Sequence, residues 1–555
     1  MPNEIRVHSF DVQGLIRLLS SAAHIVQTDD ETGEPVYQID YLARYCKRLG
    51  VVTVVSESHY VDRHFLDEFA LYYARNLRTP PNTVQRFHMF KRPFSDEGFA
   101  ELIDQRAALP SETGAAFDSA LAKDYLGFVS IRPVAGAPVG RTVLRRLEDD
   151  DHRDIWATGE YVVHLANLRL SVEGIPFQQQ DEAVGACATA ALWSALNRVS
   201  RRDGMRAPTP AEVSEAASSH LLTTGRTLPA IGGFTMEQLA EAVRQKGLAP
   251  EYVGTESPWR FMAALHTYLR SGIPVVLELR PLIEVDEPGR PKRISFGGRH
   301  AVTAVGFQTG DSCDSVLEGT LPLNSAFIKK LYLHDDRLGP YARAFVRPTR
   351  RRPIRDDDDD DGEDPDHRED LDDREFLPEC ILLEVETKRE GDDRDEPNKD
   401  GLETWLVESA LAPVYPKLRL PVRSLIQLGE QLGRDVEHIV GDRAKHLRVD
   451  LYYQRCGEYV QGLNGMVASK AANAFFCEIV FPRWCALVRW SLDGNPVADF
   501  VFDTTDILRE GELPSDGPQR RPDGGNKLLL AVVSLQHSYR DDLLKLAARL
   551  GVAAI

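Results

Sequence analysis

The sequence predicts an α+β protein built from several domains. With 555 residues, of which 43% are hydrophobic, the chain is long enough for two to four packed cores. Some segments place apolar residues at helical spacing, and others are short apolar runs rich in β-branched residues, so helices and strands are both expected. We expect domains at residues 1–150, 151–345 and 401–555. Residues 346–400 form an acidic, largely disordered insertion between the last two, with a returning strand near 379–386.

The N-terminal domain, residues 1–150, has the pattern of a mixed α/β unit. Residues 51–55 form a β-branched strand, residues 61–77 have helical spacing, and residues 125–133 form a second strand that ends at a proline. Aromatic side chains are dense between residues 60 and 73, which is more typical of a core than of a ligand-binding face. The sequence of this domain contains no phosphate-binding loop and no metal-ligand cluster.

Cys187 begins the most informative helix of the chain. Small or apolar residues recur from it at four-residue steps, at Ala191, Ala195 and Val199, as in a buried helix. A cysteine attacks a carbonyl only as the thiolate, and a free thiol has a pKa of about 8.5. A helix N-terminus carries about half a positive charge, and it stabilises a thiolate, as does a neighbouring imidazolium. Cys187 is therefore a candidate nucleophile, and a core cysteine on an alanine-rich helix is the alternative.

His300 is the candidate general base. It follows a Gly-Gly turn at 297–298 and opens the apolar run 301–307, which has the length of a buried strand. A histidine at the start of such a strand can face a helix N-terminus across a cleft. The alternative is a structural histidine whose hydrogen bonds are satisfied at the end of the strand.

The third candidate is an acid at the end of a later strand. Residues 330–340 are typical of a strand that ends in carboxylates and then turns at Gly339 and Pro340. A carboxylate that accepts the second ring N–H of a catalytic histidine fixes its tautomer and orientation. The strand phase favours Asp335 for this role, with Asp336 as the fallback.

The fourth candidate is Gln180, seven residues before Cys187, with Gln178 and Gln179 also available. A side-chain amide at this position can join the Cys187 backbone N–H in an oxyanion hole, which donates to the charge of a tetrahedral intermediate. A polar loop before a helix is the alternative explanation for the three glutamines.

In the order Gln180, Cys187, His300, Asp335, residues 175–345 resemble a papain-like cysteine peptidase, closest in style to the double-glycine leader-peptidase branch. Two connecting stretches are also similar to that family, namely the helix opening at residues 232–243 and the segment 269–277. The resemblance implies a Cys-bearing helix packed on an antiparallel sheet that carries His300 and Asp335. It also implies Cys187 as nucleophile, His300 as base, Asp335 as orienting acid and Gln180 as oxyanion donor. The chain departs from many relatives because no Gly or Trp follows Cys187, and Asp336 rather than a proline follows Asp335.

The acidic insertion carries most of the net charge of −19. Residues 356–375 hold 14 Asp or Glu against Arg368 and Arg374, a local charge of −12. Like charges this dense repel one another, so this stretch is expected to be disordered. The charge also argues against a general nucleic-acid surface, since the basic cluster at 350–355 is directly next to it.

The C-terminal domain, residues 401–555, is expected to be α+β. Strands at 485–490 and 497–502 flank a turn at 492–495, as in a hairpin, and a strand at 528–533 precedes a final helix. Residues 503–506 offer carboxylates for a metal, but their spacing fits no EF-hand and a strand-end turn explains them better.

We expect a soluble intracellular enzyme. No apolar run reaches the 18 to 20 residues that span a bilayer, and residues 1–4 resemble no signal sequence. Seven scattered cysteines without a Cys-x-x-Cys pattern indicate neither a disulfide framework nor a zinc site. The expected activity is a cysteine hydrolase, foremost a peptidase, acting on a protein or peptide substrate without cofactor, nucleic acid or membrane. An acyltransferase, a glutamine deamidase of toxin-like effectors and a non-catalytic binding module remain alternatives on the same fold.

Overall fold

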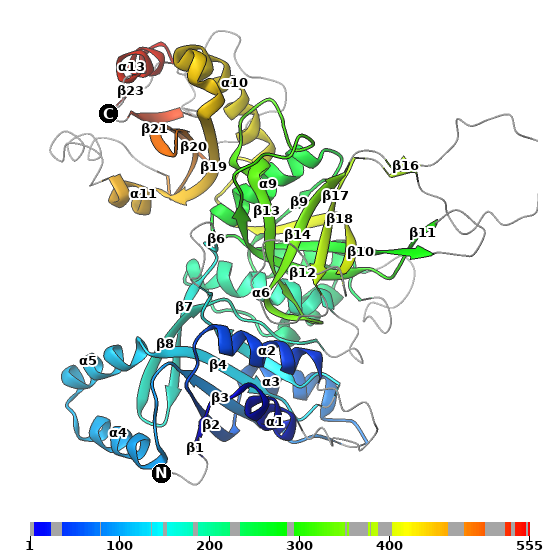
Figure 1. Cartoon of the computed structure of the whole chain (residues 1–555), viewed down its shortest axis with the longest axis vertical. Helices are drawn as coiled ribbons and strands as arrows, with labels where there is room; N and C mark the ends of the chain where they lie inside the picture. Colours follow the sequence, from blue (N-terminus) through cyan, green and yellow to red (C-terminus); the bar gives the residue numbers. More distant parts are fainter. Residues whose placement is uncertain are drawn as a thin grey trace, which may run out of the picture.

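The computed structural model contains helices and several β-sheets, which confirms the predicted mixed, multidomain class (Figure 1). It describes residues 5–23, 36–77, 79–134, 136–147, 153–180, 187–221, 233–285, 293–349, 352–353, 376–377, 379–386, 402–463, 482–505, 528–533, 539–550 and 553–554. The acidic stretch 356–375, predicted to be disordered, lies outside the described residues.

The N-terminal unit is an antiparallel sheet covered on both faces. Its strands pair in sequence order: β1 (Ile5–Ser9), β2 (Thr53–Tyr60), β3 (Val84–Phe90), β4 (Tyr125–Ile131) and β5 (Val139–Leu144). Side chains alternate between the faces, so Val54 packs with α1 (Val12–Ala22) and α2 (Tyr37–Arg48), whereas Val55 packs with α4 (Asp96–Ala108) and α5 (Ser111–Ala122).

The helix predicted over residues 61–77 is shorter and changes its winding. It consists of α3 (Arg63–Glu68) followed by a π-helical turn over Phe69–Tyr73, where the Ala74 N–H bonds the Phe69 carbonyl at 2.8 Å. The wider turn brings Tyr73 to the side of Phe65, and the two ring centroids are 6.2 Å apart in a small core with Val84.

A hairpin of β7 (Gly159–Leu165) and β8 (Leu168–Gly174) packs on the N-terminal sheet. The chain then bonds to β5, since the backbones of Thr142 and Phe177 exchange two hydrogen bonds of 2.8 Å. The sequence analysis assigned these residues to the central domain. Apolar and polar residues alternate along both strands of the hairpin, and such a pattern does not show which sheet the apolar face covers. Residues 175–180 thus reach the Cys187 helix directly from the N-terminal sheet.

The central unit is a large antiparallel sheet. Within the described ranges, β10, β12, β13, β14, β17 and β18 pair in that order, and β18 pairs again with β10, so these strands close a ring. The strands of this sheet are β6 (Arg153–Asp154), β9 (Ala249–Val253), β10 (Val275–Val285), β11 (Arg293–Phe296), β12 (His300–Thr309), β13 (Ile328–Asp335), β14 (Gly339–Thr349), β17 (Cys380–Glu386) and β18 (Leu402–Val414). A separate short pair joins β15 (Arg352–Pro353) to β16 (Phe376–Leu377).

The ring extends beyond the boundary predicted at residue 345. The returning strand near 379–386 is confirmed as β17, and β18, which the sequence placed in the C-terminal domain, belongs to the central sheet. The helices packed around this sheet are α6 (Cys187–Arg202), α7 (Pro210–Ser218), α8 (Met236–Gln245) and α9 (Pro258–Arg270), with a 3₁₀ turn at Asn324–Phe327. The Thr303 hydroxyl on β12 donates to the Ala191 carbonyl of α6 at 2.7 Å and so fixes the helix on the strand.

The C-terminal sheet pairs β19 (Leu447–Arg455), β20 (Trp484–Leu492), β21 (Asn495–Asp503), β22 (Leu528–Val533) and β23 (Ala553–Ala554) in that order. The predicted hairpin is confirmed as β20 and β21, and Asp493 and Gly494 take the positive φ angles, 51° and 78°, of a tight hairpin turn. The helical segments of this unit are α10 (Val422–Val440), the 3₁₀ segment Gly441–His446, α11 (Cys456–Leu463) and α13 (Arg540–Arg549). Side chains of β19 and β20 share one core with the central sheet.

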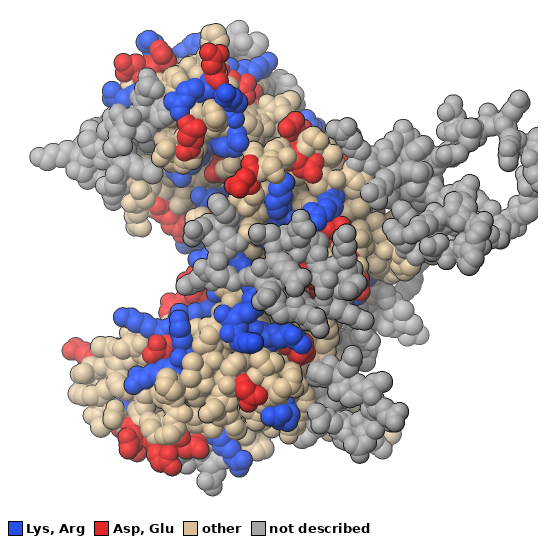
Figure 2. All heavy atoms as spheres, viewed as in Figure 1, with Lys and Arg blue, Asp and Glu red and all other residues tan. Residues whose placement is uncertain are grey.

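Acidic and basic side chains are both scattered over the face shown in Figure 2. None of the helices among the described residues combines the length and apolar character needed to cross a bilayer.

Candidate active site

Three of the four predicted site residues lie together at the ends of their elements. Cys187 is the first residue of α6, His300 is the first of β12, and Asp335 is the last of β13. β12 pairs with β13 and packs against α6, so the fold itself brings the three side chains to one place.

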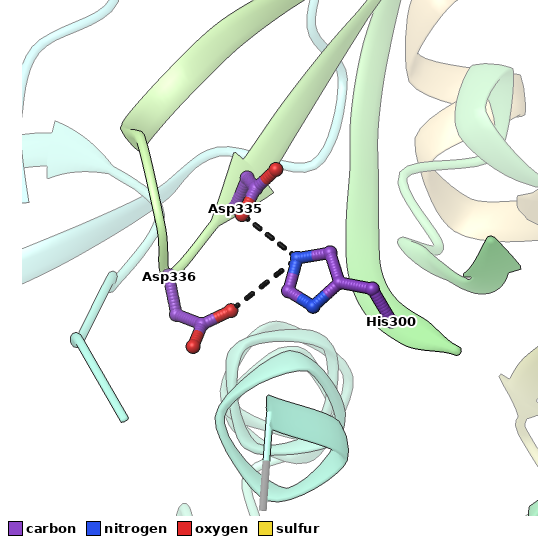
Figure 3. Close-up of side chains that lie close together, drawn as sticks. All are labelled: His300, Asp335 and Asp336. Atoms are coloured by element: carbon purple, nitrogen blue, oxygen red, sulfur yellow. Dashed lines mark hydrogen bonds and ion pairs between the residues drawn. The ribbon is translucent and has the colours of Figure 1, made fainter. Parts of the chain in front are cut away.

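The imidazole of His300 links the other two side chains. Its Nε2 lies 2.9 Å from Asp335 Oδ1, and Cys187 is near enough for its side chain to help raise the pKa of His300. Figure 3 shows the Nε2 edge facing the two aspartates while the second ring nitrogen, Nδ1, points toward α6. The Nδ1 edge of the ring is therefore the one that faces the helix beginning at Cys187, while the Nε2 edge faces the carboxylates.

The pKa of His300 is set by burial and by the neighbouring side chains, and the neighbours together outweigh burial. Burial lowers the pKa of a histidine, but Asp335, together with Cys187 and Asp336, raises the pKa of His300 well above 6.5. His334, which directly precedes Asp335 on β13, provides an internal comparison. It is also buried, bonds Ser194 Oγ at 3.2 Å and has no carboxylate partner among the described residues, and burial lowers the pKa of His334 to about 3.

Asp335 and Asp336 are not equivalent. Asp335 accepts from His300 and from the Arg337 backbone N–H, 2.9 Å from its Oδ1, and these contacts outweigh burial and lower the pKa of Asp335. The Oδ1 of Asp336 is 3.6 Å from His300 Nε2 and has no hydrogen-bond partner among the described residues. The preference for Asp335 over Asp336 from strand phase agrees with this geometry.

We expect Asp336→Asn to stabilise the protein at pH 8 and to change little at pH 4. Burial, opposed by His300 and reinforced by Asp335, raises the pKa of Asp336 from 3.8 to about 6. The folded state therefore holds this proton more tightly than the unfolded state, and stability falls as pH rises from about 4 through 6. An uncharged side chain should recover about 1–3 kcal/mol at pH 8. Urea unfolding at both pH values checks the difference.

Asp335→Asn is the matched control, and its effect on the free energy of unfolding at pH 8 should have the opposite sign. The pKa of Asp335 is lowered, so its ionised form contributes stability above pH 4 and the variant should lose stability at pH 8. Equal losses for both variants would mean that the two carboxylates share the imidazole equally.

Gln180 is buried, but the structure gives no contact between it and Cys187, and residues 181–186 lie outside the described part. Its Oε1 has no hydrogen-bond partner among the described residues. The other two glutamines are already engaged. Gln178 Nε2 donates to Glu68 at 2.6 Å, and the Gln179 side chain accepts from the Val139 backbone N–H at 3.2 Å. Gln180 is therefore the one of the three whose side-chain oxygen has no hydrogen-bond partner in the described part of the chain.

A buried ion pair of the N-terminal unit holds this loop. Arg132 Nη1 lies 3.1 Å from Glu68, and its Nη2 donates to the Gln179 carbonyl at 2.6 Å. Both side chains are nearly fully buried. Sequence reasoning missed this pair, because neither residue lies in a recognisable motif.

Trp405 on β18 was also missed. Its ring centroid lies 5.6 Å from that of His300, and its indole N–H donates to Glu403 at 3.1 Å. The Arg337 guanidinium stacks over the same ring at 4.5 Å and pairs with Glu403 at 3.0 Å. Trp405 thus covers one side of the imidazole with a ring that other contacts hold in place.

Among the described residues, the ligand atoms of His300, Asp335 and Asp336 form a group within 4.8 Å that is suited in principle to a cation. A cation bound there would take the place of the proton that His300 Nε2 shares with Asp335. A chelator such as EDTA should therefore change the activity only if a metal rather than a proton occupies this position.

We expect Cys187 to react with iodoacetamide at pH 7 at least ten times faster than Cys313. Both are partly exposed, whereas Cys46, Cys380, Cys456 and Cys485 are buried. Burial and the charges of Glu318 and Asp314 raise the pKa of Cys313, so it is a matched thiol without activation. Peptide mapping by mass spectrometry over time gives both rates. Equal rates would remove Cys187 as the nucleophile.

A scan against models of known protein families finds no match to this chain, and a search of curated proteins finds no similar sequence.

Proposed function

We propose that this protein is a cysteine hydrolase that cleaves peptide bonds, with a papain-like arrangement of its central unit. The observation that supports this best is the continuous link from Cys187 through His300 to Asp335. The resemblance of residues 175–345 to papain-like peptidases, which rests on the order of these residues in the sequence, also supports it.

The proposed reaction begins with an ion pair of the Cys187 thiolate and the His300 imidazolium. The thiolate attacks the substrate carbonyl carbon, a C–S bond forms, and the carbonyl electron pair moves to oxygen. The Cys187 backbone N–H and the Gln180 amide donate to that oxyanion. His300 gives its proton to the leaving nitrogen as the C–N bond breaks, which releases an amine and leaves a thioester.

Hydrolysis of the thioester reverses these roles. His300 takes a proton from water, whose oxygen attacks the thioester carbonyl, and the C–S bond breaks to give a carboxylic acid and the thiolate. Asp335 stays ionised throughout and holds the imidazole through Nε2.

The decisive experiment exposes cell-lysate proteins to the wild-type protein and to Cys187→Ala, and maps new N-termini by mass spectrometry. New N-termini with the wild type alone, unaffected by EDTA, are the expected result. Ammonia release without new N-termini would assign glutamine deamidation instead. Neither product, together with uniform alkylation of the thiols, would assign a binding module.

A further inference from the structure

A cavity of about 540 Å³ lies at the end of α6 remote from Cys187. It opens between the C-terminal ends of α6 and α9, the strands β19 and β20, and α11. Since α6 has 16 residues, its ends are about 22 Å apart, so this cavity is separate from the candidate active site.

Four arginines line the cavity, and two of them are already paired. Arg202 bonds Glu458 at 2.8 Å, and Arg489 pairs with Asp499 at 2.7 Å. Arg198 and Arg270 form no ion pair with any residue of the described part. The lining therefore holds two guanidinium charges that lack a carboxylate partner there.

Arg198 is the more unusual of the two. Its Nε is buried without a hydrogen-bond partner in the described part of the chain. Burial and the neighbouring charge of Arg202 lower the pKa of Arg198, so its environment disfavours the cation it carries. An anion in the cavity would relieve that repulsion.

Arg270 is held in a fixed plane. Its guanidinium lies 3.8 Å from the ring centroid of Trp156 and 4.8 Å from that of Tyr452. The nearby carboxylate of Asp154 accepts from the Trp156 indole at 3.2 Å and feels the charge of Arg270, but the two form no ion pair among the described residues. A stacked guanidinium keeps its edge N–H groups available for bidentate contact with an anion.

The helix ends do not account for these charges. Each C-terminus contributes roughly half a negative charge, and Arg202 already donates to the Ser271 carbonyl at the end of α9 at 2.7 Å. Arg201 and Arg202 lie in the last turn of α6, so its dipole is balanced without Arg198.

We propose that this cavity binds a small phosphorylated molecule of nucleotide size, whose phosphate oxygens pair with Arg198 and Arg270. Three features favour a phosphate ligand. A planar guanidinium group matches the geometry of phosphate oxygens, aromatic rings hold one of the two guanidinium groups in place, and the cavity volume is in the usual range for small-molecule sites. The inference does not depend on the proposed function.

The test is isothermal titration of the full-length protein at constant ionic strength with ATP, pyrophosphate, inorganic phosphate and citrate. Saturable binding of ATP or pyrophosphate, at least tenfold tighter than citrate, is expected. Tighter binding of ATP than of pyrophosphate would assign an organic phosphate, and the reverse would assign a free polyphosphate. Absence of saturable binding by every phosphate, or equal binding of citrate, would overturn the proposal.

Variants separate a binding role from a structural one. Arg198→Met should weaken binding at least tenfold without lowering the Tm, because it removes an unpaired charge and keeps the stem. Arg201→Met is the matched control, since Arg201 is exposed on the same helix, donates to the Glu160 carbonyl and does not line the cavity. It should bind normally. If Arg198→Met lowers the Tm, Arg198→Lys, which keeps the charge and loses the fork, should still weaken binding in a folded protein. Unchanged affinity in both Arg198 variants would refute the assignment.

Discussion

Replacing Cys187 with alanine should lower turnover at least 10⁴-fold, and replacing His300 in addition should cost little more. In the proposed mechanism the two side chains act as one nucleophile–base pair, so removing either one removes the activated nucleophile. Their effects are therefore expected to be strongly non-additive. The measurement is kcat of both single variants and the double variant on a peptide found through its new N-terminus.

The fold should survive the Cys187 substitution. Cys187 is half-buried at the first position of α6, and its small neighbours Ala188 and Ala190 leave the helix packing unchanged when one sulfur is lost. Cys313→Ala removes a similarly exposed thiol away from the site and should retain full activity. Additive losses in the double variant would mean that Cys187 and His300 act separately.

Local sequence signals were sufficient for the three residues at element ends. Cys187, His300 and Asp335 each lie next to a glycine-containing turn or a change of periodicity, and such boundaries are visible within a few residues. The strand phase was also readable at Asp335, because β13 is buried along its length.

Contacts distant in sequence could not be predicted in this way. The ring closure depends on pairing between β10 and β18, whose residues Glu278 and Ser409 are 131 positions apart and joined by a side-chain hydrogen bond. An alternating strand has the same pattern in any sheet, so β18 was assigned to the wrong unit. Trp405, which covers His300, was missed for the same reason.

The three glutamines illustrate the same limit. Their spacing from Cys187 favoured Gln180, but the sequence could not show what the other two side chains contact. The partners of Gln178 and Gln179 are Glu68 and the backbone of Val139 in the N-terminal unit. The N-terminal sheet therefore has a definite relation to the site, which is to anchor the loop before α6.

Replacing Gln180 with alanine should lower kcat by roughly 10² to 10³ with little change in KM, because an oxyanion donor acts on charge that develops only in the transition state. Gln180→Glu should be at least as impaired, since an ionised carboxylate accepts and cannot donate. Gln180→Ala should keep a Tm close to that of the wild type, because the Oε1 of Gln180 has no hydrogen-bond partner to lose among the described residues. Gln180→Glu should lower the Tm, because it buries a carboxylate.

Gln178→Ala is the matched control, and it should affect stability more than kcat. It leaves the buried carboxylate of Glu68 with Arg132 as its remaining side-chain partner, so about 1–3 kcal/mol of stability should be lost. Its kcat should fall less than that of Gln180→Ala at a temperature where both are folded. Thermal unfolding and steady-state kinetics on the same preparations separate the two effects. An unchanged kcat in Gln180→Ala would transfer the oxyanion role to backbone N–H groups alone, and the loop would then serve only to connect the N-terminal sheet to α6.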